Sequence, residues 1–475
     1  MESVNVFSPA AYSGLLPEYA VLGGILAICL SVFLIPRLAA GVSVWISLLA
    51  ICLAFFYAAA DEKVLLPSGL QISSSTGILK QYFCVSASVV LFQWLEWRQE
   101  RSVTFSPLFP CLLLTSVLSL MILVQASELW LMILAAEGFS FSAYCLAAWN
   151  SDGADSGKSA LRYFGVGALA TGISIFGFTW ITGFSDAVIS GEGGFSDSLA
   201  FFPVAGAVLF LAFIFFKLGC FPFQSWVSGI FVSSPTPVAG FLASAPKVAA
   251  GFLCLNLVDA LDVNLTFPLV FLAIATAVLG NLSAFRSRNL KEIMGFSAVG
   301  QASFLVIPSV FSRQVSGAEF QLLYFALTYG IAVQAAFSAI QYFENHLGDN
   351  LVVKDMAGIG KDHFVPAIAF SCLLVSVAGL PPFAGFTAKL LVMSALPAGS
   401  NLFPSGWLYA LYGTGLVTTI LAAGYFLPIP FQLFFISKGI ERHEIRSSAA
   451  SLTIMVASVV ILLLLFFYPS LILNY

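Results

Sequence analysis

The sequence predicts an all-α polytopic membrane protein with about fourteen transmembrane helices, two inverted five-helix repeats and breaks in helices 7 and 12. Three observations support this fold class. Of 475 residues, 60% are hydrophobic and 9% are charged, whereas an ordinary soluble domain has about 25% charged residues. Apolar runs of membrane-spanning length recur along the chain. Three short motifs also recur in the same order about 160 residues apart.

The remaining composition excludes several classes of function. The formal net charge is only −4, and no basic tract suggests a nucleic-acid partner. No connection between apolar runs is long enough for a separate catalytic domain, so residues 1–475 are expected to form a single membrane domain in contact with lipid.

The apolar runs predict the individual spans. Most are close to the 20 residues that a helix needs to cross a bilayer. They lie at 18–36, 38–60, 78–96, 106–125, 128–149, 160–183, 199–231, 237–259, 266–285, 291–311, 318–343, 364–397, 406–435 and 450–471. The seventh and twelfth runs are too long for one straight span, and both contain prolines in the middle. We therefore expect these two helices to be interrupted.

Basic residues in the connections predict the orientation. Connections after odd-numbered spans hold Arg37, Arg98, Arg101, Lys158, Arg286, Arg288, Lys291, Lys354, Lys361, Lys438, Arg442 and Arg446, and the opposite side holds Lys63, Lys80 and Arg313. The positive-inside rule places the first group in the cytoplasm, and both termini on the non-cytoplasmic side. The first 20 residues lack a basic segment, so no cleaved signal peptide is expected.

The recurring motifs predict an internal repeat. They are GFS at 138–140 and 295–297, YF at 163–164 and 324–325, and G-x-x-P-F at 219–223 and 379–383. The shared order indicates a duplicated five-span unit, at 106–259 and 266–435, preceded by three helices within 1–105 and followed by one at 450–471. Because five is odd, the copies have opposite orientations. In such repeats, broken helices in matching positions mark the ion pathway, which singles out Pro222, Pro381 and Pro382.

Once charges in connections and at span ends are set aside, five charged residues remain within the predicted spans: Glu137, Arg162, Lys217, Lys247 and Lys389. A charge at the bilayer centre costs roughly 2.5–3.5 kcal/mol, so together they indicate a continuous polar interior. Arg162 lies near a span end, and snorkelling to the surface is as reasonable as a functional role. Glu137 and Lys217 fit either a structural ion pair or a functional one.

Lys247 and Lys389 favour a proton relay, because no acid lies near them in the sequence and both are far from span ends. Burial disfavours the charged form of a lysine, which suits a group that gains and loses a proton. In this hypothesis Lys217, stabilised by Glu137, passes its proton to Lys247. The proton then reaches Lys389 through water and polar side chains of the tenth span, namely Ser297, Gln301 and Ser303.

No cofactor or metal site is predicted in this chain. All eight cysteines, Cys29, Cys52, Cys84, Cys111, Cys145, Cys220, Cys254 and Cys372, fall in apolar segments, and none forms a C-x-x-C pair. The three histidines lie in connections, so no histidine pair inside the spans is expected to hold a haem.

Three long segments resemble a known family. FKLGCFPFQSWVSGIFVSSPTPVAGFLASAPKVAA, GNLSAFRSRNLKEIMGFSAVGQASF and DMAGIGKDHFVPAIAFSCLLVSVAGLPPFAGFTAK are similar to the antiporter-like subunits of respiratory complex I and of multisubunit cation/proton antiporters. The similarity runs from about residue 105 to 435. ALRYFGVGALATG, the lysine at position 389 and the chain's end soon after the last span are most similar to the N-type branch.

The resemblance implies a proton-translocating subunit of a quinone oxidoreductase in the bacterial cytoplasmic membrane. It implies that the matching glutamate and lysine, Glu137 and Lys217, form a pair, that Lys247 links two half-channels and that Lys389 serves the outlet. NADH or another donor, FMN, iron–sulfur clusters and quinone are then expected in other subunits. M-type and small A-, J- and K-type subunits are the expected partners.

Three departures bear on this expectation: Arg162, Gln224 and Gln301 stand where the family has lysine or histidine. Arginine does not deprotonate at physiological pH, and glutamine does not titrate. A subunit of a sodium/proton antiporter and a non-pumping scaffold are the alternative functions.

Overall fold

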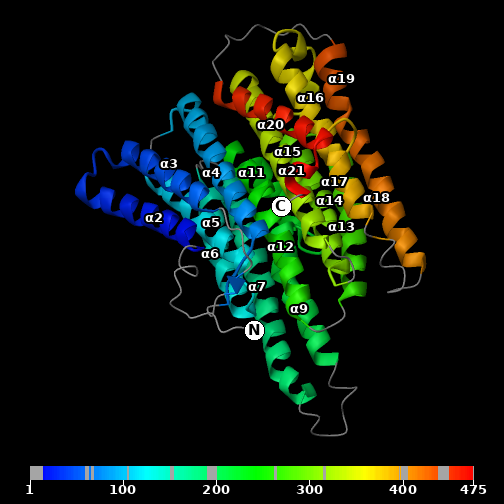
Figure 1. Cartoon of the computed structure of the whole chain (residues 1–475). Coiled ribbons are helices and arrows are strands. Elements are labelled where there is room, and N and C mark those ends of the chain that lie inside the picture. Colours follow the sequence, from blue (N-terminus) through cyan, green and yellow to red (C-terminus); the bar gives the residue numbers. More distant parts are fainter. Residues whose placement is uncertain are drawn as a thin grey trace.

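The computed structural model describes residues 14–58, 64–65, 69–103, 106–149, 154–189, 201–261, 265–313, 317–394, 396, 405–436 and 449–473. The chain is almost entirely helical there (Figure 1). Its principal helices are α2 (Leu16–Leu34), α3 (Ala39–Tyr57), α4 (Ser74–Glu100), α5 (Leu108–Gln125), α6 (Leu129–Ala147), α7 (Ala154–Ile189), α9 (Phe201–Leu218), α10 (Val227–Ser233), α11 (Thr236–Ala243), α12 (Ala245–Ala260), α13 (Thr266–Arg286), α14 (Leu290–Phe311), α15 (Ala318–Leu347), α16 (Phe364–Ala378), α17 (Ala384–Ser394), α18 (Ser405–Phe426), α19 (Pro428–Phe435), α20 (Ala449–Phe467) and α21 (Ser470–Leu473).

Short elements complete the described chain. Strands β1 (Val64–Leu65) and β2 (Gln71–Ile72) pair antiparallel, and three 3₁₀ turns follow, η1 (Gln224–Trp226), η2 (Val353–Met356) and η3 (Ile359–Lys361). The all-α prediction is confirmed, since a hairpin of two strands with two residues each does not change the fold class.

Twelve helical segments of the described chain are long and apolar enough to cross a membrane. They correspond to twelve of the fourteen predicted spans. The two remaining spans are the seventh and twelfth, where the structure has the shorter helices α9 and α10, and α16 and α17. Both predicted breaks are therefore confirmed.

The two breaks have the same backbone geometry. Gly219 and Gly379 end α9 and α16 with φ of +70° and +82°. At each helix end the N–H of the residue after the glycine bonds back across the last turn, from Cys220 N to Phe215 O and from Leu380 N to Val375 O. This is the bonding pattern of a helix terminated by a left-handed glycine. Each break also holds a cis X-Pro bond, at Pro222 and Pro382. The matched positions support the repeat.

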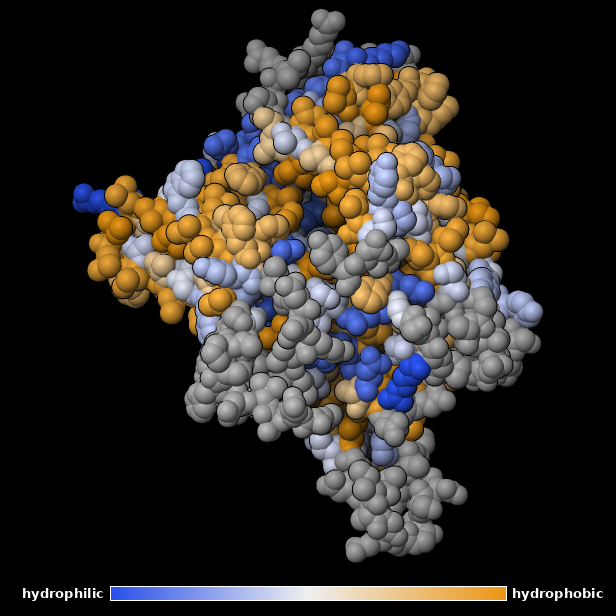
Figure 2. All heavy atoms as spheres, viewed as in Figure 1, coloured by the Kyte–Doolittle hydropathy of each residue, from blue (hydrophilic) through white to orange (hydrophobic). Residues whose placement is uncertain are grey.

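Helices α14 and α15, which lie between the two breaks in the sequence, are at the centre of the molecule. The spanning windows of α14 and α15 are each 94% buried, whereas that of α20 is 22% buried. In Figure 1, α2 and α3 lie at one edge and α18 and α19 at the opposite edge. Figure 2 shows a largely hydrophobic outer surface in this view, with exposed large side chains such as Trp45 and Phe435. Such a surface suits contact with lipid.

Two of the basic residues expected in connections or at span ends are buried and ion-paired. Lys80 is inside α4 and 2.9 Å from a carboxylate oxygen of Glu18, and Lys291 is inside α14 and 2.9 Å from one of Glu344. All four side chains are buried. The sequence did not predict this burial, which is tolerable because each lysine finds an acid on another helix. Four further connection charges, Lys63, Lys438, Arg442 and Arg446, lie outside the described residues.

Candidate functional site

The first break carries Lys217, one residue before the end of α9. Its ammonium group donates a hydrogen bond to Ser140 of α6. Ser140 Oγ lies 3.4 Å from Glu137 Oε1, which also accepts a 2.6 Å hydrogen bond from Thr171 of α7. The ammonium lies 5.1 Å from the centre of the Phe139 ring. Glu137 and Lys217 are thus connected through a hydroxyl rather than by direct contact, and sequence reasoning missed both hydroxyl residues.

Replacing Ser140 with Ala removes the group between the carboxylate and the ammonium. If the pair relays protons, we expect translocation by the assembled complex to fall several-fold. The reason is that the hydrogen bonds linking the Glu137 carboxylate to the Lys217 ammonium lose about 1 kcal/mol. Ser142→Ala is the matched control, because Ser142 is buried on the same helix but bonds Ser116 and backbone carbonyls. Equal pumping by both variants would contradict this role for Ser140. Proton uptake by reconstituted vesicles measures it.

Lys247 lies in the first turn of α12, just after a bend at Ser244 that separates α11 from α12. Its side chain is fully buried. The ammonium donates to the carbonyl of Leu218, 2.6 Å away, and to that of Ala298, 3.0 Å away. Leu218 is the last residue of α9, so its carbonyl has no helical partner. Among the described residues, no carboxylate lies within ion-pair distance of Lys247.

The second break repeats this arrangement. Lys389 of α17 donates a 2.8 Å hydrogen bond to the carbonyl of Ala378, the last residue of α16. The neighbouring carbonyl, of Val377, accepts a 3.0 Å hydrogen bond from Gln301 of α14. Lys389 is buried, with its ammonium 5.1 Å from the centre of the Phe304 ring. In both copies, a lysine therefore binds the carbonyl that the helix break leaves free.

Helix α14 connects the two breaks. Ala298 contacts Lys247, and Gln301, nearly one turn further along, contacts the end of α16. Ser297 and Ser303 are buried on the same helix. Ser303 donates to the carbonyl of Gly300, 2.7 Å away. Helix α14 thus touches Lys247 and the end of α16 through Ala298 and Gln301, and the relay role of Ser297 and Ser303 stays a prediction.

The other predicted residues lie away from this buried line. Arg162 is exposed on α7, and Gln224 is partly buried in η1. Pro222, Pro381 and Pro382 are exposed at the two breaks. Arg162 therefore contributes no group to the interior, and its position fits the snorkelling interpretation.

Sequence reasoning also missed a buried ion pair on the side predicted to face the cytoplasm. Lys291 and Glu344 form this pair, and Glu344 also accepts a hydrogen bond from Thr236. Beside it lies a cavity of about 380 Å³ lined by residues of several connections and helix ends, including Arg101, Lys291 and Asp349. Lys291 therefore faces an aqueous cavity from within the fold.

A histidine pair lies at the same end of α15. His363, in the connection before α16, is 2.9 Å from the hydroxyl of Tyr342, and its ring centre is 4.9 Å from that of His346. Burial, together with the neighbouring His346, lowers the pKa of His363. These surroundings therefore favour the neutral form of His363.

The chain is similar to known membrane proteins. A bacterial relative, NADH-quinone oxidoreductase subunit N of Chlorobium chlorochromatii, is 28% identical over 384 residues, covering 77% of this chain and 73% of the relative. Subunit N of Trichlorobacter lovleyi is 26% identical over 489 residues, covering 99% of this chain and 97% of the relative.

Solved structures share the fold. A chain of respiratory complex I from Thermus thermophilus matches with a TM-score of 0.78 at 23% identity, covering 96% of this chain and 98% of that chain. A chain of the Mrp complex from Dietzia sp. also has a TM-score of 0.78, at 17% identity, covering 98% and 96%. Residues 126–417 match the family described as NADH:quinone oxidoreductase/Mrp antiporter, TM. Since that match spans more than half of the chain, this protein belongs to the family of transmembrane subunits shared by NADH:quinone oxidoreductases and Mrp antiporters.

Proposed function

We propose that this chain translocates protons as an antiporter-like membrane subunit of a complex I-type NAD(P)H- or ferredoxin-quinone oxidoreductase. One observation carries the proposal. Lys247 and Lys389 are buried without a carboxylate partner in the described structure, and each holds its ammonium on the carbonyl at a helix break. A lysine needed only for structure would be expected to have a fixed counter-ion.

The contacts suggest an order for the proton positions. Lys217 and Lys247 reach the same break, because Lys247 bonds the carbonyl of Leu218, the residue after Lys217. In this order a proton that leaves Lys217 passes next to Lys247, which is bound at the end of the same helix. Gln301, bonded at the end of α16, lies on the way to Lys389. Since the glutamine does not titrate, bound water is required for the transfer between the two halves.

The break carbonyls give the relay a conformational component. A protonated lysine binds the carbonyl strongly, because the donor is charged, and a neutral lysine binds it weakly. Loss of the proton therefore loosens the contact between the lysine and the interrupted helix. Because this chain is expected to hold no redox centre, the energy for this cycle would come from contacts with neighbouring subunits.

The assembly follows from the same proposal. M-type and small A-, J- and K-type membrane subunits are the proposed neighbours in the bacterial cytoplasmic membrane, with both termini on the non-cytoplasmic side. NADH or another donor, FMN, iron–sulfur clusters and quinone would bind other subunits. The Mrp-type structure is as similar in fold as the complex I chain, but the relatives named subunit N favour the quinone oxidoreductase.

Lys217→Ala and Lys389→Ala test the function. In the assembled complex reconstituted in vesicles, we expect both to lower the number of protons translocated per electron, because each removes a protonation site from the relay. Lys354→Ala is the control, since Lys354 is exposed in η2. If both buried-lysine variants pump like Lys354→Ala, the chain is a scaffold. A sodium gradient without quinone reduction would instead indicate the antiporter.

A further inference from the structure

Helix α15 has a polar face inside the most buried part of the protein. Gln334, Ser338, Gln341 and Glu344 follow one another at spacings of four, three and three residues, which places them along one face of a helix. All four are at most 4% exposed. A buried apolar helix does not need such a stripe, and its polar groups are costly unless they are hydrogen-bonded.

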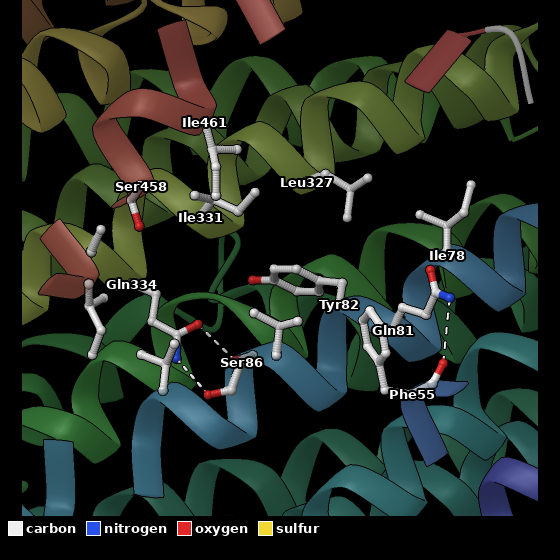
Figure 3. Close-up of a pocket in the computed structure, with 14 residues that line it drawn as sticks. Phe55, Ile78, Gln81, Tyr82, Ser86, Leu327, Ile331, Gln334, Ser458 and Ile461 are labelled. Atoms are coloured by element: carbon white, nitrogen blue, oxygen red, sulfur yellow. Dashed lines mark hydrogen bonds between the residues drawn. The ribbon is translucent and has the colours of Figure 1, made fainter. Parts of the chain in front are cut away.

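Helix α4 supplies a matching polar face. Ser86 and Gln334 exchange two hydrogen bonds, from Ser86 Oγ to Gln334 Oε1 at 2.8 Å and from Gln334 Nε2 to Ser86 O at 2.9 Å (Figure 3). Further along, Gln93 donates to Ser338, and Gln341 donates to the carbonyl of Gln93 at 2.8 Å. We define the polar seam as Gln93, Gln334, Ser338, Gln341 and Glu344.

Two side-chain acceptor atoms in the polar seam lack a hydrogen-bond donor in the described part of the chain. The side-chain oxygens of Gln93 and Gln341 are buried and have no hydrogen-bond partner among the described residues, although the two side chains are 1% and 0% exposed. Buried acceptors of this kind are typically satisfied by ordered water. They therefore point to water as the ligand of the seam.

One end of the polar seam lies at the aqueous cavity. Glu344 is paired with Lys291, which lines the cavity of about 380 Å³ on the side predicted to be cytoplasmic. Thr236, at the start of α11, also bonds Glu344. The seam thus begins at a carboxylate that has a basic partner facing the cavity.

The other end reaches the bend before Lys247. Gln334 Oε1 lies 3.4 Å from Ser244 Oγ, and the carbonyl of Ser244 accepts the backbone N–H of Lys247 at 3.1 Å. A second cavity, of about 300 Å³, borders this end and is lined by Tyr82, Ser86 and Gln334 among mainly apolar residues (Figure 3). Figure 2 shows a hollow with a hydrophilic floor near the middle of this face.

We propose that the polar seam is a hydrated conduit that brings protons from the cytoplasmic-side cavity to Lys247 without passing through Glu137 and Lys217. The inference rests on the proposed function. In the first step, hydronium in the cavity gives its proton to the Glu344 carboxylate, leaving water and a neutral acid that no longer pairs ionically with Lys291. The acid passes the proton to water in the seam, and the neutral amine of Lys247 takes it up as ammonium.

Thiol labelling tests the hydration of the polar seam apart from pumping. Ser338→Cys and Ala336→Cys both place a thiol on buried α15, but positions 336 and 338 point about 200° apart. In the intact complex in inside-out membrane vesicles, with Ag⁺ added on the cytoplasmic side, we expect Ser338→Cys to react at least about tenfold faster, since reactivity requires access. The reaction of the native cysteines is measured on the unsubstituted complex and subtracted. Equal rates would overturn the conduit.

Glu344→Gln tests the uptake step, with Glu319→Gln as the control at the opposite end of α15. We expect the first to slow proton uptake severalfold at unchanged complex content, because glutamine cannot carry the proton. If Lys217 and Lys389 prove essential while Glu344→Gln pumps like Glu319→Gln, the conduit is overturned and the proposed function stands. If Lys217→Ala and Lys389→Ala leave pumping unchanged, the proposed function fails, and the seam's proton role fails with it even where Ser338→Cys is reactive.

Discussion

Replacing Lys247 with Met is expected to abolish proton translocation through this subunit while the complex still assembles. Methionine has a similar length and no charge, so it fills the site. The change leaves the carbonyls of Leu218 and Ala298 without the ammonium that binds them. Each unsatisfied carbonyl costs about 1–3 kcal/mol, and this loss is offset because a buried charge is also removed. The effect on transport is complete because both halves of the relay meet at this amine.

Lys247→Arg separates the charge from the proton transfer. Arginine keeps a positive charge and can donate to the same carbonyls, but it does not deprotonate. We therefore expect Lys247→Arg to assemble and still fail to pump. Lys361→Met, an exposed lysine of η3, is the matched control for the loss of a charge. The number of protons translocated per electron by the reconstituted complex is measured for Lys247→Met, Lys247→Arg and Lys361→Met. Normal pumping by Lys247→Arg would mean that a fixed charge is sufficient at this position.

Local sequence patterns predicted the elements whose causes are local. The apolar runs located the spans, and the prolines with their preceding glycines located both breaks, because a left-handed glycine followed closely by proline ends a helix. Three buried lysines, Lys217, Lys247 and Lys389, were also identified, since a charge in the middle of an apolar run is conspicuous. The repeat followed from the same motifs, and Gly219 and Gly379 have similar backbone angles.

Interactions between distant helices could not be predicted in this way. Lys291 and Glu344 are 53 residues apart, and each lies near the end of a span, so the sequence indicated two ordinary surface charges. Ser140 is likewise an unremarkable serine until packing places it between two charged groups. For Arg162 the sequence located the helix but not the face, which depends on how α7 packs.

The polar seam was overlooked for a related reason. Glutamine and serine are frequent enough in membrane helices that Gln334 or Ser338 alone carries little information. Their meaning arises from a second polar face on α4, about 250 residues earlier in the chain. The polar stripes on α4 and α15 are visible in the sequence at helical spacing, but the sequence does not show which polar faces meet.

Gly379→Ala is expected to disable the second half of the relay by moving Lys389. A Cβ at Gly379 would lie 2.6 Å from Lys389 Cδ and 2.9 Å from its Nζ. The lysine is the flexible partner, so it shifts away from the carbonyl of Ala378, which it now binds at 2.8 Å. A displacement of about 1 Å at a reacting group lowers rates by as much as 10²-fold. We therefore expect proton translocation to fall at least about tenfold.

Gly317→Ala separates this effect from backbone strain. Gly317 also has a left-handed backbone, with φ of +99° against +82° for Gly379, but a Cβ there meets nothing within 4 Å. Both substitutions cost about 1–2 kcal/mol for the left-handed conformation, so both should lower the thermal stability of the complex to a similar degree. Only Gly379→Ala displaces a lysine, and only it should lose pumping. Parallel losses in both variants would show that the relay depends on the backbone of its helix ends and not on where the ammonium of Lys389 lies.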